Sequence, residues 1–143
     1  PLLAQQLEAA GFKVTQDVRE YNQIESEALA GKFDAVLVSR STVLDSGDAV
    51  AYMTADFSSS GSYSMSGLHD EKVDAAISKA AATQPGDERH KAIMAAEQAI
   101  LASGAAIPLA HERVIQGEAA GVTGAQRDPG ERALITSATT VKK

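Results

Sequence analysis

Arg40 is the residue of this sequence that is best placed to bind a ligand. Its lone guanidinium comes two positions after the end of the apolar run from Phe33 to Val38. A planar guanidinium can donate two parallel hydrogen bonds to a carboxylate or a phosphate. The alternative role is structural, a salt bridge from Arg40 to Asp45 or Asp48 in the loop that follows. Both roles are compatible with the sequence.

The patterns that would indicate catalysis or metal binding are not found. His69, His90 and His111 lie far apart, and no two of them have the i, i+4 spacing that aims two imidazoles at one zinc ion. No serine lies in a Gly-x-Ser-x-Gly turn, and there is no glycine-rich loop for a nucleotide. Acids such as Asp70 and Asp74 are better explained as helix caps and solvated groups than as an acid–base pair. We therefore expect no catalytic residue, no metal and no cofactor.

Arg40 is expected to lie at the carboxyl edge of an open, mostly parallel β-sheet in an α/β fold. Apolar and polar residues alternate from Phe12 to Val18, as in a strand with one face against a core. The run from Phe33 to Val38 is typical of a strand covered on both faces. A helical crossover between two such strands makes them parallel. Because open parallel sheets bind ligands beyond the carboxyl ends of their strands, Ser39, Arg40 and Ser41 are candidate ligand-binding residues.

Helices are expected to flank this sheet near residues 2–10, 22–30, 70–83 and 87–103. Asn22 with Glu25, three residues on, predicts the cap of the second helix, and Gly31 predicts its end. Asp70 or His69 can cap the third.

Shorter elements are expected in the rest of the chain. Residues 49–57 favour a short helix inside a long serine-rich loop, with Asp48 or Ser46 as its cap and with Val50, Met53 and Phe57 inward. The segment from Ala105 to Ala110 predicts an edge strand, because it contains a proline. One more short strand is expected at Ala133 to Thr136.

The composition is that of a soluble globular protein with one domain. The chain has 143 residues, 44% of them hydrophobic and 22% charged, and no apolar run approaches the length that spans a bilayer. A net charge of -6 argues against nucleic acid as a partner, since such binding relies on clustered Lys and Arg. The absence of cysteine excludes disulfides and thiolate chemistry but does not identify the compartment. Because the chain starts at Pro1 without a methionine, we interpret it as a piece of a longer protein.

Five short motifs occur in a characteristic order between Leu2 and about Val122. They are LLAQQLEAAGFKV at 2–14, KFDAVLV at 32–38, the segment from Ser62 to Asp74, DER at 87–89 and IPL at 107–109. In order and spacing they resemble the C-terminal lobe of the family 5 extracellular solute-binding proteins. These are the oligopeptide-, dipeptide- and nickel-binding components of bacterial ABC importers. Where the family commonly has a tryptophan after the second strand, this chain has Ser39 and Arg40.

The resemblance implies one lobe of a two-lobed, periplasmic-binding-protein-like fold that closes on its solute. The lobe would bind a peptide or another small polar solute without catalysis. The residues that it would present to the solute are Ser39, Arg40, Ser41, Asp45, Tyr63 and Ser64. The implied partners are the solute, the missing N-terminal lobe and an ABC permease. The implied location is extracellular or periplasmic, with membrane contact through the permease or through a lipid anchor outside this segment.

A second hypothesis is a small stand-alone α/β domain. In it the same loop would bind a partner protein or support a weak hydrolytic reaction. The length of the native reading frame separates the two hypotheses. An export signal and several hundred residues upstream of Pro1 would favour the solute-binding lobe, whereas a start codon next to Pro1 would favour the stand-alone domain.

Overall fold

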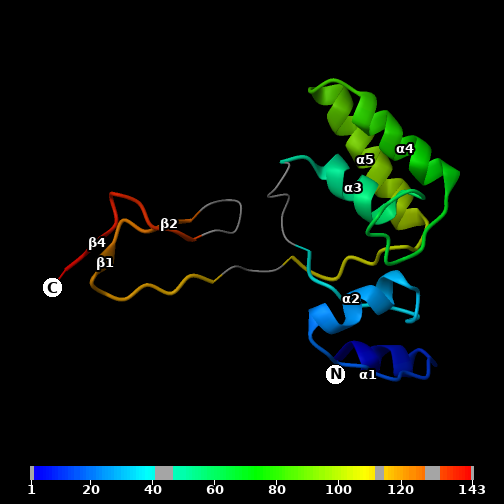
Figure 1. Cartoon of the computed structure of the whole chain (residues 1–143), viewed down its shortest axis with the longest axis horizontal. Coiled ribbons are helices and arrows are strands. Elements are labelled where there is room, and N and C mark those ends of the chain that lie inside the picture. The colour runs from blue at the N-terminus through cyan, green and yellow to red at the C-terminus, as the bar shows by residue number, and fades with distance from the viewer. Residues whose placement is uncertain (1, 41–46, 112–114, 128–132, 143) are drawn as a thin grey trace.

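Five helices and four very short strands make up the regular structure of the described residues. The computed structural model describes residues 2–40, 47–111, 115–127 and 133–142. The helices are α1 (Leu2–Ala9), α2 (Tyr21–Leu29), α3 (Ala49–Phe57), α4 (Glu71–Ala82) and α5 (Asp87–Ala102). The strands are β1 (Val122–Thr123), β2 (Gln126–Arg127), β3 (Ala133–Leu134) and β4 (Thr140–Val141). In Figure 1 α3, α4 and α5 lie together, α1 and α2 lie below them, and the strands form a C-terminal arm that extends away from the helices.

The predicted α/β fold with an open, mostly parallel sheet is wrong, because the regular structure of the described residues is mainly helical. Neither Phe12 to Val18 nor Phe33 to Val38 forms a strand. The strand pairs among the described residues are antiparallel, β1 with β4 and β2 with β3. Several apolar side chains of the two segments are turned to solvent, among them Phe12, 64% exposed, and Leu37, 71% exposed. A strand needs neighbouring strands to pair its backbone and a packed face to be stable, and the described part of the chain supplies neither to these segments.

Of two shorter predicted strands, one does not form and the other is only partly formed. The segment from Ala105 to Ala110 has no strand structure. Of the predicted strand from Ala133 to Thr136, only the first two residues form β3, paired with β2 in the arm.

The helix predictions are confirmed, because local signals specify helices. The Asp70 carboxylate caps α4 by accepting a hydrogen bond from the Lys72 amide at 2.8 Å. The Asp48 carboxylate caps α3 by accepting one from the Val50 amide at 3.0 Å. The predicted Asn22 cap is wrong. Asn22 lies inside α2, which begins at Tyr21. The cap residue is Glu20, and its side chain makes no capping hydrogen bond.

The hydrophobic core lies where α3, α4 and α5 meet. Its buried members are Val50 from α3, Val73, Ile77 and Ala80 from α4, and Ala92, Ala96 and Ile100 from α5. Ala80 and Ala96 are fully buried, so the small side chains of both long helices allow their backbones to approach closely. Figure 1 shows α4 and α5 side by side, with α3 across one end.

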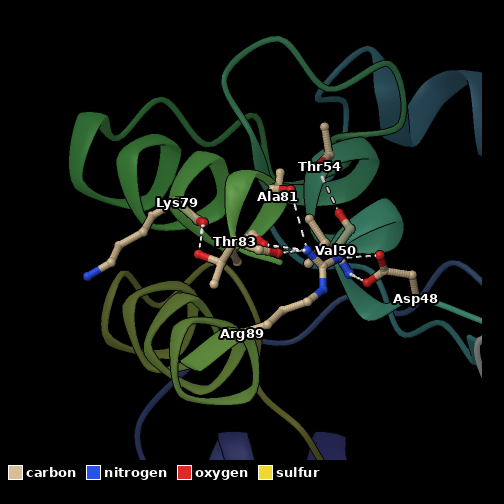
Figure 2. A network of polar contacts seen from close by, with 8 residues as sticks. Asp48, Val50, Thr54, Lys79, Ala81, Thr83 and Arg89 are labelled. Atoms are coloured by element: carbon tan, nitrogen blue, oxygen red, sulfur yellow. Dashed lines mark hydrogen bonds and ion pairs between the residues drawn. The ribbon is translucent and has the colours of Figure 1, made fainter. Parts of the chain in front are cut away.

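Arg89, in the first turn of α5, ties the three helices together (Figure 2). Its Nη1 donates hydrogen bonds to the carbonyl oxygens of Ala80 at 2.6 Å, Thr83 at 2.9 Å and Ala81 at 3.3 Å. These carbonyls end α4 and lack partners inside the helix, and a cation at that end also complements the helix dipole. Its Nη2 forms an ion pair with the Asp48 carboxylate, the cap of α3. One guanidinium thus connects the end of α4 with the beginning of α3.

Outside the three-helix unit, burial is slight. Among the described elements, α1 and α2 are not in close backbone contact with α3, α4 or α5, and each has one buried residue, Ala4 and Ala28. Large apolar side chains are exposed on α1, on the segments before and after α2 and on the arm, including Leu2, Val18, Leu37, Ile115, Ile135 and Val141. In the described part of the chain, no helix has the length and apolar character needed to cross a bilayer.

Candidate functional site

Arg40 lies in a cluster of aromatic rings and one carboxylate. Its Nη2 donates a hydrogen bond to the Asp56 carboxylate at 2.9 Å. Its guanidinium carbon lies 4.7 Å from the centre of the Tyr52 ring and 4.9 Å from that of Tyr63. Both distances are short enough for cation–π attraction. We call Arg40, Tyr52, Asp56 and Tyr63 the Arg40 cluster.

Helix α3 and the loop after it position this cluster. Tyr52 and Asp56 are four residues apart on α3, so their side chains lie on the same face of the helix. Tyr63 is held by its backbone N–H, which donates to the Ala55 carbonyl oxygen at 3.0 Å. The loop reaches α3 so closely at Gly61 that a Cβ there would lie 2.4 Å from the same Ala55 oxygen. The close approach at Gly61 and the Tyr63 hydrogen bond thus bring the loop against the same turn of α3.

The cluster combines a largely buried carboxylate with a more exposed guanidinium cation. The Asp56 side chain is 13% exposed and that of Arg40 is 43% exposed. Burial raises the pKa of Asp56 above its ordinary value, and the charge and hydrogen bond of Arg40 oppose that rise. The exposed side of Arg40 remains accessible to a ligand.

The sequence-predicted site residues are only partly brought together. Arg40 and Tyr63 are in contact. Ser39 is exposed, and the Ser64 hydroxyl is buried with no hydrogen-bond partner among the described residues. Ser41 and Asp45 lie outside the described residues.

The sequence did not indicate the carboxylate partner of Arg40. Of the two expected partners, Asp45 lies outside the described residues and Asp48 pairs with Arg89, whereas Arg40 pairs with Asp56.

Tyr52 and Asp56 are the members of the cluster that sequence reasoning missed. A signal for them was present, because the helix at 49–57 was expected with Val50 and Phe57 inward. A helix with those residues inward places Tyr52 and Asp56 together on a different face.

The cluster has the groups for binding rather than for a reaction. A guanidinium has five N–H donors, and the hydrogen bond to Asp56 uses one of them. The others suit a carboxylate or phosphate, with the tyrosine rings as apolar walls. Among the described residues, no three His, Asp or Glu side chains are grouped so that they could hold a metal ion.

Comparisons with known proteins show no relative: no family model, no curated protein and no solved structure matches this chain. The resemblance to the family 5 solute-binding proteins therefore rests on the sequence motifs.

Proposed function

We propose that this chain binds an anionic group of a small solute through Arg40, as the C-terminal lobe of a solute-binding protein of an ABC importer. One observation carries the proposal: the Arg40 guanidinium is held against two tyrosine rings and one carboxylate, with 43% of its side chain exposed. Contacts of this kind restrict the arginine before the ligand arrives, so less conformational entropy is lost on binding. The carboxylate of a short peptide is a suitable partner.

The proposed activity is binding without catalysis. The carboxylate next to Arg40 is committed to it through the 2.9 Å hydrogen bond, so Asp56 would hold the arginine rather than transfer a proton. The tyrosine rings contact the guanidinium with their faces and would act as walls of the site. The bound solute would then be delivered to a membrane permease outside the cell or in the periplasm.

A second lobe of the same protein is the partner that would complete the site. Enclosure by protein normally buries most of the surface of a small ligand, and the Arg40 cluster covers one side of a ligand at most. The exposed apolar side chains of Phe12, Val18 and Leu37 offer a surface for that lobe. We therefore expect the 143-residue chain alone to bind short peptides weakly or not at all.

The test compares two arginines in the protein expressed from its whole reading frame. Arg40→Ala is expected to weaken the binding of short peptides by about 1.5 to 3 kcal/mol, or roughly 10- to 150-fold, through loss of a charge-assisted contact. Arg19→Ala is the matched control, because Arg19 also contacts an aromatic ring, Phe33, and pairs with the carboxylates of Asp17 and Glu27. The control variant is expected to bind like the parent, as measured by calorimetry.

The melting temperatures of the same variants separate ligand binding from structural support. If the Arg40→Ala protein has a lower melting temperature but an unchanged affinity, the role of Arg40 is only to attach the chain at this position to α3. Failure of the whole protein to bind any short peptide would instead favour the stand-alone domain and reject a peptide importer component.

A further inference from the structure

A polar cleft lies between α3 and α4, and the residues that line it are different from those of the Arg40 cluster. Its volume is about 320 Å³. That volume is at the lower end of the range for small-molecule sites. The lining side chains are Thr54, Ser58 and Ser60 from α3 and the loop after it, and Asp74, Ile77, Ser78 and Ala81 from α4.

Two of the hydroxyl protons on the α3 side of the cleft are already in use. The Thr54 hydroxyl donates to the Val50 carbonyl oxygen at 2.8 Å, a bond drawn in Figure 2. The buried Ser58 hydroxyl donates to the Thr54 carbonyl oxygen at 2.7 Å. Because a hydroxyl has a single proton, both groups can offer only acceptor lone pairs to a ligand. These two groups therefore favour a ligand that brings hydrogen-bond donors, whereas the hydroxyls of Ser60 and Ser78 can donate or accept.

The charge of the cleft is negative. The Asp74 carboxylate accepts a hydrogen bond from the Ser59 amide at 2.8 Å. Hydrogen bonds from Ser59, from its side chain first and then from its backbone, lower the pKa of Asp74, so this group is ionised at neutral pH. Thr54 and Ser58 also lie at the C-terminal end of α3, the negative end of the helix dipole. A cation is therefore favoured over an anion or a neutral molecule.

The remaining walls are apolar. Ile77 is buried in the core beneath the cleft, and Ala81 lies one helical turn further along the same face of α4. These two side chains leave room for a short alkyl group next to the polar end. From the acceptor oxygens, the single carboxylate and the apolar floor, we propose that this cleft binds a small primary ammonium compound, with the ammonium group at Asp74 and its alkyl chain on Ile77 and Ala81.

The experiment is an NMR titration of the ¹⁵N-labelled chain with ethylammonium chloride. Backbone signals of Ser59, Ser60 and Ser78 are expected to shift in a saturable way. Three comparison probes define the chemistry: tetramethylammonium has the charge without N–H donors, ethanol has the alkyl chain without the charge, and acetate has the opposite charge. None of the three is expected to shift these signals in a saturable way.

Three variants locate the site. Asp74→Asn keeps an oxygen that can accept from Ser59 and removes the charge, so affinity for ethylammonium is expected to fall by at least about tenfold. Ser78→Leu places a larger side chain in the cleft from an exposed position and is expected to abolish binding. Glu71→Gln removes a carboxylate from an exposed position of the same helix and is expected to change nothing.

Two results would overturn the proposal. The first is the absence of a saturable shift with ethylammonium in the parent chain. The second is a saturable shift of the same size with tetramethylammonium, which would show that the cleft attracts any small cation without recognising N–H donors. Because Arg40 does not line this cleft, Arg40→Ala is expected to leave the titration with ethylammonium unchanged. This result is expected whether or not Arg40 binds a solute.

Discussion

At the scale of single residues, Arg40 and Arg89 have different surroundings although both pair with an aspartate near α3. Arg89 is mostly buried, and its donors serve backbone carbonyls that would otherwise have no partner. Arg40 is held mainly by two rings and one carboxylate and keeps an exposed side. A guanidinium that is mostly buried and bonded to backbone carbonyls stabilises the fold, whereas one with an exposed side and uncommitted donors can also bind a ligand.

Asp56 gives a prediction about pH. A carboxyl whose pKa is higher in the folded chain than in the unfolded chain binds its proton more tightly when folded. Its ionised form therefore costs stability at neutral pH, and this cost disappears as the pH falls through the raised pKa toward and below the ordinary value of 3.8. Asp56→Asn keeps an acceptor oxygen for Arg40 and removes the shielded charge. We expect its melting temperature at neutral pH to equal or exceed that of the parent.

The same measurement at acid pH is the control for Asp56. Any advantage of the Asn variant is expected to shrink below pH 3.8, where the parent carboxyl is protonated in both states. A variant that melts well below the parent at neutral pH would show instead that attraction to Arg40 outweighs the cost of burial.

At the scale of elements, contacts at the ends of helices determine how α3, α4 and α5 are joined. Arg89 connects the end of α4 to the cap of α3 (Figure 2). The loop after α3 is attached to that helix through Tyr63 and to α4 through Asp74. These contacts place the Arg40 cluster and the polar cleft near the same end of α3.

Arg89→Ala is expected to lower the free energy of unfolding by about 3 kcal/mol, because it leaves the end of α4 and the Asp48 carboxylate without their cation. Chemical denaturation monitored by circular dichroism measures this loss. Lys91→Ala is the matched control on the same helix. It removes an ion pair between two well-exposed side chains, Lys91 and Glu88, and should change stability by less than about 1 kcal/mol. Equal effects of the two variants would contradict the role of Arg89.

Gly61→Ala tests the attachment of the loop. The new Cβ would lie 2.4 Å from the Ala55 oxygen and 2.8 Å from that of Thr54, so the loop must move away from α3. We expect a loss of about 1 to 3 kcal/mol in stability, as for other overpacked sites, together with a change in the near-ultraviolet circular dichroism of the tyrosines. Gly117→Ala has open space around it and serves as the control. Unchanged tyrosine signals in Gly61→Ala would show that the ring of Tyr63 does not depend on this approach.

At the scale of the whole molecule, stability is concentrated in one part of the chain. The buried core belongs almost entirely to α3, α4 and α5, whereas α1, α2 and the arm expose large apolar side chains (Figure 1). Such exposed apolar surface fits a chain that packs against another lobe, as proposed above.

Hydrogen exchange by NMR or mass spectrometry tests this distribution of stability. Amides of α4 and α5 around Val73, Ile77 and Ala96 are expected to exchange only on global unfolding, whereas those of α1 and the arm should exchange orders of magnitude faster. Uniform protection along the chain would contradict a single stable unit. If the proposed second lobe is present, protection is expected to rise near Phe12 and Leu37 while α4 and α5 stay unchanged.

The sequence by itself determined where the helices are. The Asp48 and Asp70 caps and the helical spacing of apolar residues act within a few positions along the chain, so they could be identified without knowing the fold. Tertiary structure decided that the segments from Phe12 to Val18 and from Phe33 to Val38 are not strands. A segment with a strand pattern forms a strand only when other strands pair with it. Tertiary structure also decided the partners of Arg40, because Asp56 lies sixteen positions away and meets it only once α3 has taken its place. Helices close their hydrogen bonds locally, whereas strands and side-chain clusters depend on residues that are distant in sequence.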